Sequence, residues 1–143
     1  MTTNHNKTDQ KDRTDQKTIL VAVNDIFFYT KIRDALLPNG YTLERVRTLD
    51  EVPQKLSALR PTAMIVNMND PSLDAFRALE TVRGGNSLRS MPILAFANHE
   101  EVETWKRAKE LGVTKIVSRN EFSARTRELI NELMSKQPTA SSE

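Results

Sequence analysis

The sequence predicts an α/β fold in which a parallel five-stranded sheet is covered by helices on both faces. Apolar runs and amphipathic stretches alternate five times between residues 18 and 135, and turn-forming residues separate them. The run at residues 63–67 is apolar up to its last residue, which is typical of a strand buried on both faces. Because strands that alternate with helices form right-handed βαβ units, we expect a three-layer αβα sandwich.

The first strand is expected at residues 18–23 and the first helix at residues 26–37, where Pro38 begins a turn. A weaker strand at residues 42–46 precedes a second helix, for which Asp50 is the expected N-cap. The inward positions of these two helices are Phe28, Ile32, Ala35 and Leu36, and then Val52, Leu56 and Leu59.

The second half of the domain continues the alternation. The expected strands are residues 63–67, 92–97 and 114–118, and the expected helices are residues 73–82, 100–111 and 121–134. The residues expected to punctuate them are Gly84-Gly85-Asn86, Gly112 and the N-cap Asn120. The inward helix positions are Ala75, Leu79 and Val82, and then Phe122, Leu129, Ile130 and Leu133.

The composition favours one ordinary globular domain with polar tails. The chain has 143 residues, with 21 Lys plus Arg and 19 Asp plus Glu, so its formal charge is +2. Residues 1–17 and 136–143 are polar, and we expect both to be disordered on either side of a domain at residues 18–135. No basic block stands out, so nucleic-acid binding is not indicated.

Several function classes have no support in the sequence. The absence of cysteine excludes disulfides, thiol catalysis and thiolate metal sites. No Ser/His/Asp arrangement or glycine-rich phosphate loop occurs, and His5 and His99 have no partner at ligand spacing. There is no signal segment and no apolar run long enough to cross a bilayer. We therefore expect a cytoplasmic protein that is not an enzyme and holds no metal or cofactor.

The stretch at residues 61–71 carries the main functional clue. Ligands of open parallel sheets bind at the carboxyl ends of the strands, and Asn67 ends the central strand. An enzyme or a switch would usually have a carboxylate at such a position, whereas Asn67 has an amide.

Four stretches of the sequence have a characteristic order and spacing: Ile19-Leu20-Val21, residues 61–71, Met91-Pro92-Ile93-Leu94, and Gly112 before the last strand. Together they resemble a response-regulator receiver domain. The resemblance covers about residues 18–135 and implies the flavodoxin-like strand order 2-1-3-4-5.

The resemblance also implies a phosphorylation pocket, and every pocket position departs from the family pattern. The acidic pair that binds a divalent cation corresponds to Val23 and Asn24, and the phosphoacceptor aspartate corresponds to Asn67. The hydroxyl residue after strand four corresponds to Ala97, and the lysine after strand five to Arg119. Because aspartyl phosphorylation needs a carboxylate nucleophile and a metal, the sequence indicates a pseudo-receiver that has lost phosphoryl switching.

Neighbouring charged residues have structural and functional interpretations. Asp25 is interpreted as the N-cap of the first helix and Asp70 as a solvated turn residue. Together with Asp74 they are also a candidate weak cation site. Arg119 either pairs with Asp25 and closes the pocket, or receives an anionic group from a partner.

Three aromatic residues follow the first strand. Phe28 fits the inward face of the first helix, while Phe27 and Tyr29 are expected to be partly exposed. A small aromatic ligand such as a quinone, which the resemblance allows, is the alternative to ordinary packing and exposure.

Receivers engage partners through the face made by the fourth helix, fifth strand and fifth helix. The resemblance therefore implies an interaction face with Trp105, Lys109 and Ile116, the last at the position of the family's aromatic switch. Trp105 either anchors this face or folds back onto the core beside Val102 and Ala108. The partner is either a signalling protein, as in bacterial two-component systems, or a second copy of the chain.

The sequence thus predicts a stand-alone module that acts by phosphorylation-independent protein–protein contact, with no nucleic-acid or membrane partner. The alternative is an atypical switch whose pocket binds a cation or a small ligand near Asn24, Asp25, Asn67 and Arg119.

Overall fold

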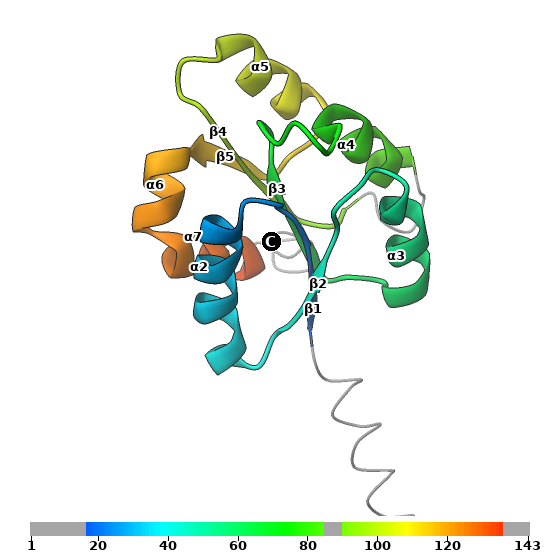
Figure 1. Cartoon of the computed structure of the whole chain (residues 1–143), viewed down its shortest axis with the longest axis vertical. Coiled ribbons are helices and arrows are strands. Elements are labelled where there is room, and N and C mark those ends of the chain that lie inside the picture. Colours follow the sequence, from blue (N-terminus) through cyan, green and yellow to red (C-terminus); the bar gives the residue numbers. More distant parts are fainter. Residues whose placement is uncertain (1–16, 85–89, 136–143) are drawn as a thin grey trace, which may run out of the picture.

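The computed structural model describes residues 17–84 and 90–135. Its centre is a five-stranded parallel sheet in the order β2-β1-β3-β4-β5 (Figure 1). The strands are β1 (Thr18–Ala22), β2 (Thr42–Arg45), β3 (Ala63–Asn67), β4 (Ile93–Ala97) and β5 (Lys115–Ser118). The predicted α/β fold and strand order are confirmed, although every expected strand except β3 is one residue too long.

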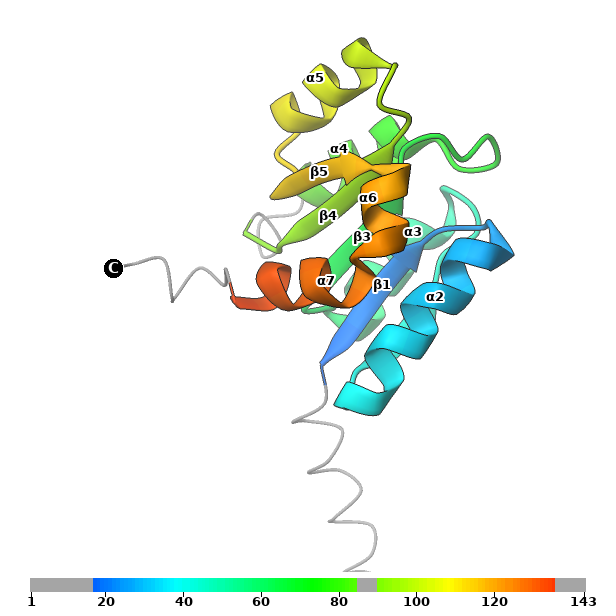
Figure 2. The same cartoon turned by 90° about the vertical axis from the view of Figure 1, so that its left-hand side faces the viewer.

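Helices cover both faces of the sheet (Figures 1 and 2). One face carries α2 (Ile26–Leu36), α6 (Arg119–Ala124) and α7 (Thr126–Ser135), and the other carries α3 (Glu51–Leu59), α4 (Ala75–Gly84) and α5 (Val102–Glu110). A short 3-10 helix, η1 (Leu37–Asn39), follows α2. No helix in the described ranges is long and apolar enough to cross a membrane.

The strand alternation divides the apolar core into two layers. In β3, Met64 and Val66 pack with α3, α4 and α5, whereas Ala63 and Ile65 pack with α2, α6 and α7. All five residues of β3 and all five of β4 are buried. Because both faces are covered, the edge formed by the carboxyl ends of the strands is where a site of this sheet can open to solvent.

Local chemistry explains most element ends, and it corrects several expectations. Ser118 caps α6 by accepting a hydrogen bond from the Glu121 N–H, so the expected cap Asn120 lies inside that helix. Asp50 occupies the N-cap position of α3, but its side chain makes no capping hydrogen bond. Gly112 ends the turn after α5 with a φ of 90°, which glycine adopts without strain.

Some expected helix positions are wrong. Leu59 is 37% exposed at the end of α3, and Val102 is 68% exposed at the start of α5. Helices α4 and α5 each begin two residues later than expected, so His99 precedes α5. Lys17, assigned to the tail, accepts a backbone hydrogen bond from Thr42. The rest of both expected tails, and Gly85 and Asn86, lie outside the described residues.

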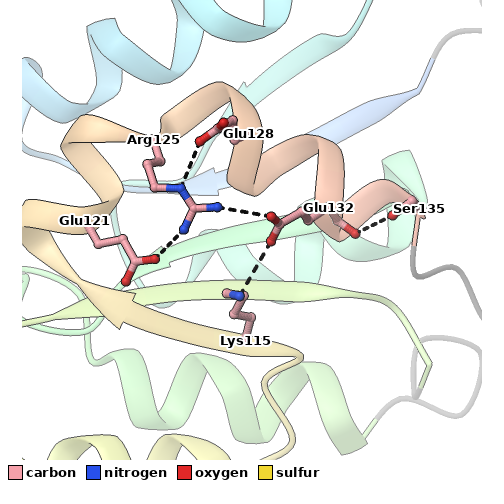
Figure 3. A network of polar contacts seen from close by, with 6 residues as sticks. All are labelled: Lys115, Glu121, Arg125, Glu128, Glu132 and Ser135. Atoms are coloured by element: carbon pink, nitrogen blue, oxygen red, sulfur yellow. Dashed lines mark hydrogen bonds and ion pairs between the residues drawn. The ribbon is translucent and has the colours of Figure 1, made fainter.

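The last expected helix is two helices that meet at Arg125, where φ is −126° and ψ is 33°. The Arg125 guanidinium contacts Glu121 of α6 at 2.6 Å, and Glu128 and Glu132 of α7 at 2.8 and 3.1 Å (Figure 3). Lys115 of β5 lies 3.5 Å from Glu132. One guanidinium therefore ties the two helices together across the break, and hydrogen bonding to Glu128 raises the pKa of Arg125.

Candidate functional site

The residues assigned to the pocket do meet at one edge of the sheet. Val23 follows β1, Asn67 ends β3, Ala97 ends β4, and Arg119 begins α6 directly after β5. Val23 and Ala97 are apolar and fully buried, so neither position supplies a ligand atom or a hydroxyl. The chemistry of the edge therefore depends on the loops that follow β1, β3 and β4.

Asn67 is buried, with 6% of its surface exposed. Its side-chain carbonyl oxygen accepts a hydrogen bond from the Asn69 backbone N–H at 2.9 Å. The amide thus stabilises the first turn of the loop after β3, and it offers no carboxylate for phosphoryl transfer.

Asn24 donates through its side chain in a way that an aspartate cannot reproduce. Its Nδ2 lies 2.9 Å from the backbone carbonyl oxygen of Arg47 and 2.6 Å from the hydroxyl oxygen of Ser72. A backbone carbonyl only accepts hydrogen bonds, so the atom that faces it must be a donor. Because a carboxylate would place negative charge against that oxygen, the contacts at this position favour the amide over an aspartate.

Asp70 is buried, which corrects the expectation of a solvated turn residue. It is 8% exposed, and its Oδ2 accepts a hydrogen bond from the Asn24 backbone N–H at 2.9 Å. Its Oδ1 accepts from the Ser72 N–H at 3.0 Å and from the Ser72 hydroxyl at 2.7 Å. The carboxylate therefore ties the loop after β3 to the loop after β1, and each of its oxygens already accepts a hydrogen bond.

A second set of polar contacts joins the loops after β3 and β4; we call Asn69, Asn98 and Glu101 the Glu101 clasp. Asn69 donates from Nδ2 to Glu101 at 2.6 Å and accepts from the Asn98 N–H at 2.7 Å. Asn98 donates from Nδ2 to the other Glu101 oxygen at 3.3 Å. Hydrogen bonds from Asn69, Asn98 and Thr104 lower the pKa of Glu101 against a smaller opposing effect of desolvation.

Trp105 is partly buried and folds back onto the core. Its indole N–H donates to the Asn98 carbonyl at 2.9 Å, and its ring packs against the core layer that contains Ala108. Ile116 is buried in β5, whereas Lys109 is exposed. Of the three residues assigned to the interaction face, Lys109 alone is freely accessible.

Asp25 is the N-cap of α2, as predicted. Its Oδ1 accepts from the backbone N–H groups of Phe27 at 2.8 Å and Phe28 at 3.4 Å. Arg119 does not pair with Asp25: its guanidinium lies over the Phe28 ring, 5.1 Å from the centroid, and Nη1 reaches the Asn98 side-chain oxygen at 3.5 Å. In the described part of the chain, no group of three acidic or histidine side chains is placed to hold a metal, so Asp25, Asp70 and Asp74 form no such cluster.

The three aromatic residues after β1 have different environments. Phe28 is buried and packs against Phe96 and Phe122, with centroids 4.9 and 6.2 Å away. Phe27 is 58% exposed. Tyr29 is partly buried beneath the Arg45 guanidinium, 4.7 Å from its ring centroid. Phe28 is therefore a core residue, and the exposure expected for Phe27 is confirmed.

No protein-family model matches the sequence, and no curated protein matches it. Solved structures share its fold. A response regulator from Hahella chejuensis has a TM-score of 0.75 at 16% identity over 85% of this chain and 97% of its own. A CheY-like receiver domain protein from Methanospirillum hungatei has a TM-score of 0.74 at 17% identity, covering 87% and 98%. The receiver domain of the sensor histidine kinase PA1611 from Pseudomonas aeruginosa has a TM-score of 0.72 at 17% identity, covering 85% and 99%.

The fold of this chain is therefore that of response-regulator receiver domains. This chain covers between 97% and 99% of each of these structures, so the similarity extends over the whole domain. At this level of identity it establishes the fold, and the site has to be interpreted from its own residues.

Proposed function

We propose that this chain is a receiver-like signalling module that acts by phosphorylation-independent contact with a partner protein. The observation that carries the proposal is the hydrogen bonding of Asn24, whose Nδ2 faces the Arg47 carbonyl at 2.9 Å. A carboxylate of the family's cation-binding pair would be repelled there. The structure around Asn24 is thus adapted to a neutral donor, and it supports loss of the cation site.

The remaining pocket residues support the same proposal. Asn67 supplies a primary amide, which is a poor nucleophile, and its oxygen is occupied by the Asn69 N–H. Ala97 supplies no hydroxyl. The PA1611 receiver carries a magnesium ion in its active-site cleft. Here the corresponding Val23 is apolar and fully buried.

The hydrogen bonds of the Glu101 clasp favour a single arrangement of the loops after β3 and β4. A switch of this fold would rearrange the loops after β3 and β4 when its ligand binds. In this chain those loops are joined by the Glu101 carboxylate, and Asn98 of the clasp also fixes the Trp105 indole. The proposed module therefore presents a constant surface, and its regulation comes from binding or abundance.

The proposal places the protein in two-component or related bacterial signalling, in the cytoplasm and without enzymatic activity. The proposed function does not include a cation in the degenerate phosphorylation pocket, because Asp25 caps α2 and both Asp70 oxygens already accept hydrogen bonds. The face formed by α5, β5 and α7 is a proposed contact surface for a signalling partner or for a second copy of the chain. Lys109 is its exposed residue. With Trp105 and Ile116 turned inward, that face lacks the expected apolar anchor.

Acetyl phosphate provides the test, with Asn67→Asp as the decisive variant. Incubation with acetyl phosphate and Mg²⁺ is followed by intact-protein mass spectrometry. We expect no phosphoryl adduct on the wild-type chain, and none on Asn67→Asp, because Val23 and Asn24 supply no carboxylate for the metal. A receiver with the complete acidic pair serves as the positive control. A stable adduct on the wild-type protein would refute the proposal.

A further inference from the structure

Two adjacent apolar side chains lie at the surface of the first turn of α2. Ile26 is 64% exposed and Phe27 58%, and they are two of the most exposed large apolar residues in the described ranges. Neighbouring exposed apolar groups are characteristic of interaction surfaces, and Phe27 of this pair also lines a cavity.

Phe27 is held in place by the buried aromatic residues beneath it. Its ring meets Phe28 edge to face, with centroids 5.3 Å apart and an interplanar angle of 81°. Phe28 in turn packs on Phe96, which stacks on Phe122 at 4.3 Å. An exposed ring on such a support loses little conformational entropy when a partner covers it.

A cavity of about 470 Å³ opens beside Phe27, between the start of α2, the loop after β4 and the start of α6. Arg119 lines it, together with Asn98, His99 and Ser123. The Arg119 guanidinium is oriented by the Phe28 ring and by the 3.5 Å contact with Asn98. Its other N–H groups remain available as donors on the side of the cavity.

Arg119 is the one lysine or arginine among the residues that line the cavity. Among residues 17–84 and 90–135, Arg119 forms no ion pair. Lys31 places a second cation 5.6 Å from the Phe27 centroid. Glu100 also lines the cavity and Asp25 caps the same turn of α2, but both carboxylates are exposed and neither pairs with Arg119. A carboxylate bound bidentately to the guanidinium would complete this arrangement.

We propose that Ile26, Phe27, Lys31 and Arg119 form a docking surface for an acidic amphipathic segment of a partner protein. A carboxylate of the segment binds Arg119, a neighbouring apolar side chain covers Phe27 and Ile26, and a second carboxylate lies near Lys31. This inference rests on the proposed function, because it supplies the apolar anchor that the face of α5, β5 and α7 lacks.

The test is an amide NMR titration of the full chain with a capped peptide of repeated Glu-Leu-Leu-Glu units. We expect shifts at Ile26, Phe27, Asn98 and Arg119. The matched peptide with Gln in place of Glu should bind about tenfold more weakly, because it keeps the apolar contact and loses the charged one. Absence of binding at millimolar Glu peptide, or equal binding of both peptides, would overturn the proposal.

Surface variants separate the contribution of the charged contact from that of the apolar contact. Arg119→Gln and Phe27→Ser should each weaken binding of the Glu peptide about five- to tenfold. Arg127→Gln and Leu37→Ser are the matched controls, since they remove an exposed cation and a 52% exposed apolar residue elsewhere, and they should leave binding unchanged. Equal losses in test and control variants would contradict a defined surface.

Other outcomes assign the cavity differently. Phenylacetate that saturates the same signals as tightly as the peptide would indicate a free aromatic acid and overturn the protein-segment proposal. Peptide shifts confined to α5, β5 and α7 would overturn this surface and leave the proposed function intact. A phosphoryl adduct on the wild-type chain would refute the proposed function, whatever the peptide does.

Discussion

At the residue scale, the loops at the carboxyl edge of the sheet are held by side chains that satisfy distant backbone groups. Asp70 accepts the Asn24 N–H, which lies 46 residues away in sequence, and Asn24 returns a hydrogen bond to Ser72. Buried N–H groups that lose an acceptor destabilise the folded state more than surface contacts do.

Replacing Asp70 with Ala should therefore lower the free energy of unfolding by about 1–3 kcal/mol, because the Asn24 and Ser72 N–H groups lose their acceptor. Urea denaturation followed by circular dichroism measures this difference. The control is Asp34→Ala, which removes an exposed carboxylate of α2 and should change stability little. Equal effects of the two substitutions would show that the Asp70 contacts contribute nothing.

Trp105, the one tryptophan of the chain, reports on the Glu101 clasp. Glu101→Gln should change Trp105 fluorescence at neutral pH, because the clasp positions the Asn98 carbonyl that accepts the indole N–H. Glu103→Gln, two residues further along the chain and exposed, lies outside the clasp and should leave the emission unchanged. Identical spectra for Glu101→Gln and wild type would contradict a role of the clasp in holding Trp105.

The pH dependence of the same signal follows from the lowered pKa of Glu101. A carboxyl whose pKa is lower in the folded state contributes stability above its ordinary value, about 4.3, and loses it as the pH falls through the lowered folded value. The wild-type emission should therefore persist through the ordinary carboxyl range and change below it.

The sequence revealed the chemistry of these residues only in part. The amide at Asn67 and the N-cap at Asp25 were predictable, because each depends on a short stretch of chain. The burial of Asp70 and the inward position of Trp105 were not, because both depend on acceptors and donors from other loops. The Asn69–Asn98–Glu101 contacts left no local signal, since each residue alone has the composition of an ordinary loop.

At the scale of elements, the alternating pattern predicted every strand to within one residue, and the larger errors concern the helices. The break at Arg125 was missed because the apolar spacing continues from Phe122 through Leu133 across it. A single arginine that hydrogen-bonds to carboxylates of both helices makes the two-helix arrangement stable without changing that pattern. Leu59 and Val102 were misplaced because each lies in a terminal turn, where the inward face is not enforced by packing.

The Arg125 contacts should contribute to stability in a salt-dependent way. We expect Arg125→Met to lower the melting temperature at low ionic strength, and the loss to shrink in molar NaCl, because salt screens partly exposed ion pairs. Arg127→Met, an exposed arginine of α7, is the control and should have little effect in either buffer. A loss that is equal at both salt concentrations would indicate that packing of the arginine stem dominates.

At the scale of the whole molecule, the fold is that of receiver domains, whereas the residues at the site differ from the family pattern. The sheet order, the two apolar layers and the similarity to response regulators from several organisms agree on the receiver architecture. At the edge that holds the switch in that architecture, the loops are here joined by hydrogen bonds of Asn24, Asp70 and the Glu101 clasp. The proposed function therefore relies on contacts of the surface and not on a phosphoryl switch at this edge.

The most direct test of this account is an amide NMR titration of the full chain with Mg²⁺ and beryllofluoride, which mimics a phosphoryl group. We expect the signals of Asn67, Arg119 and Trp105 not to move at millimolar concentrations of either additive. Shifts that converge on the ends of β1, β3 and β5 would contradict it, and they would show that the modified pocket still works as a switch.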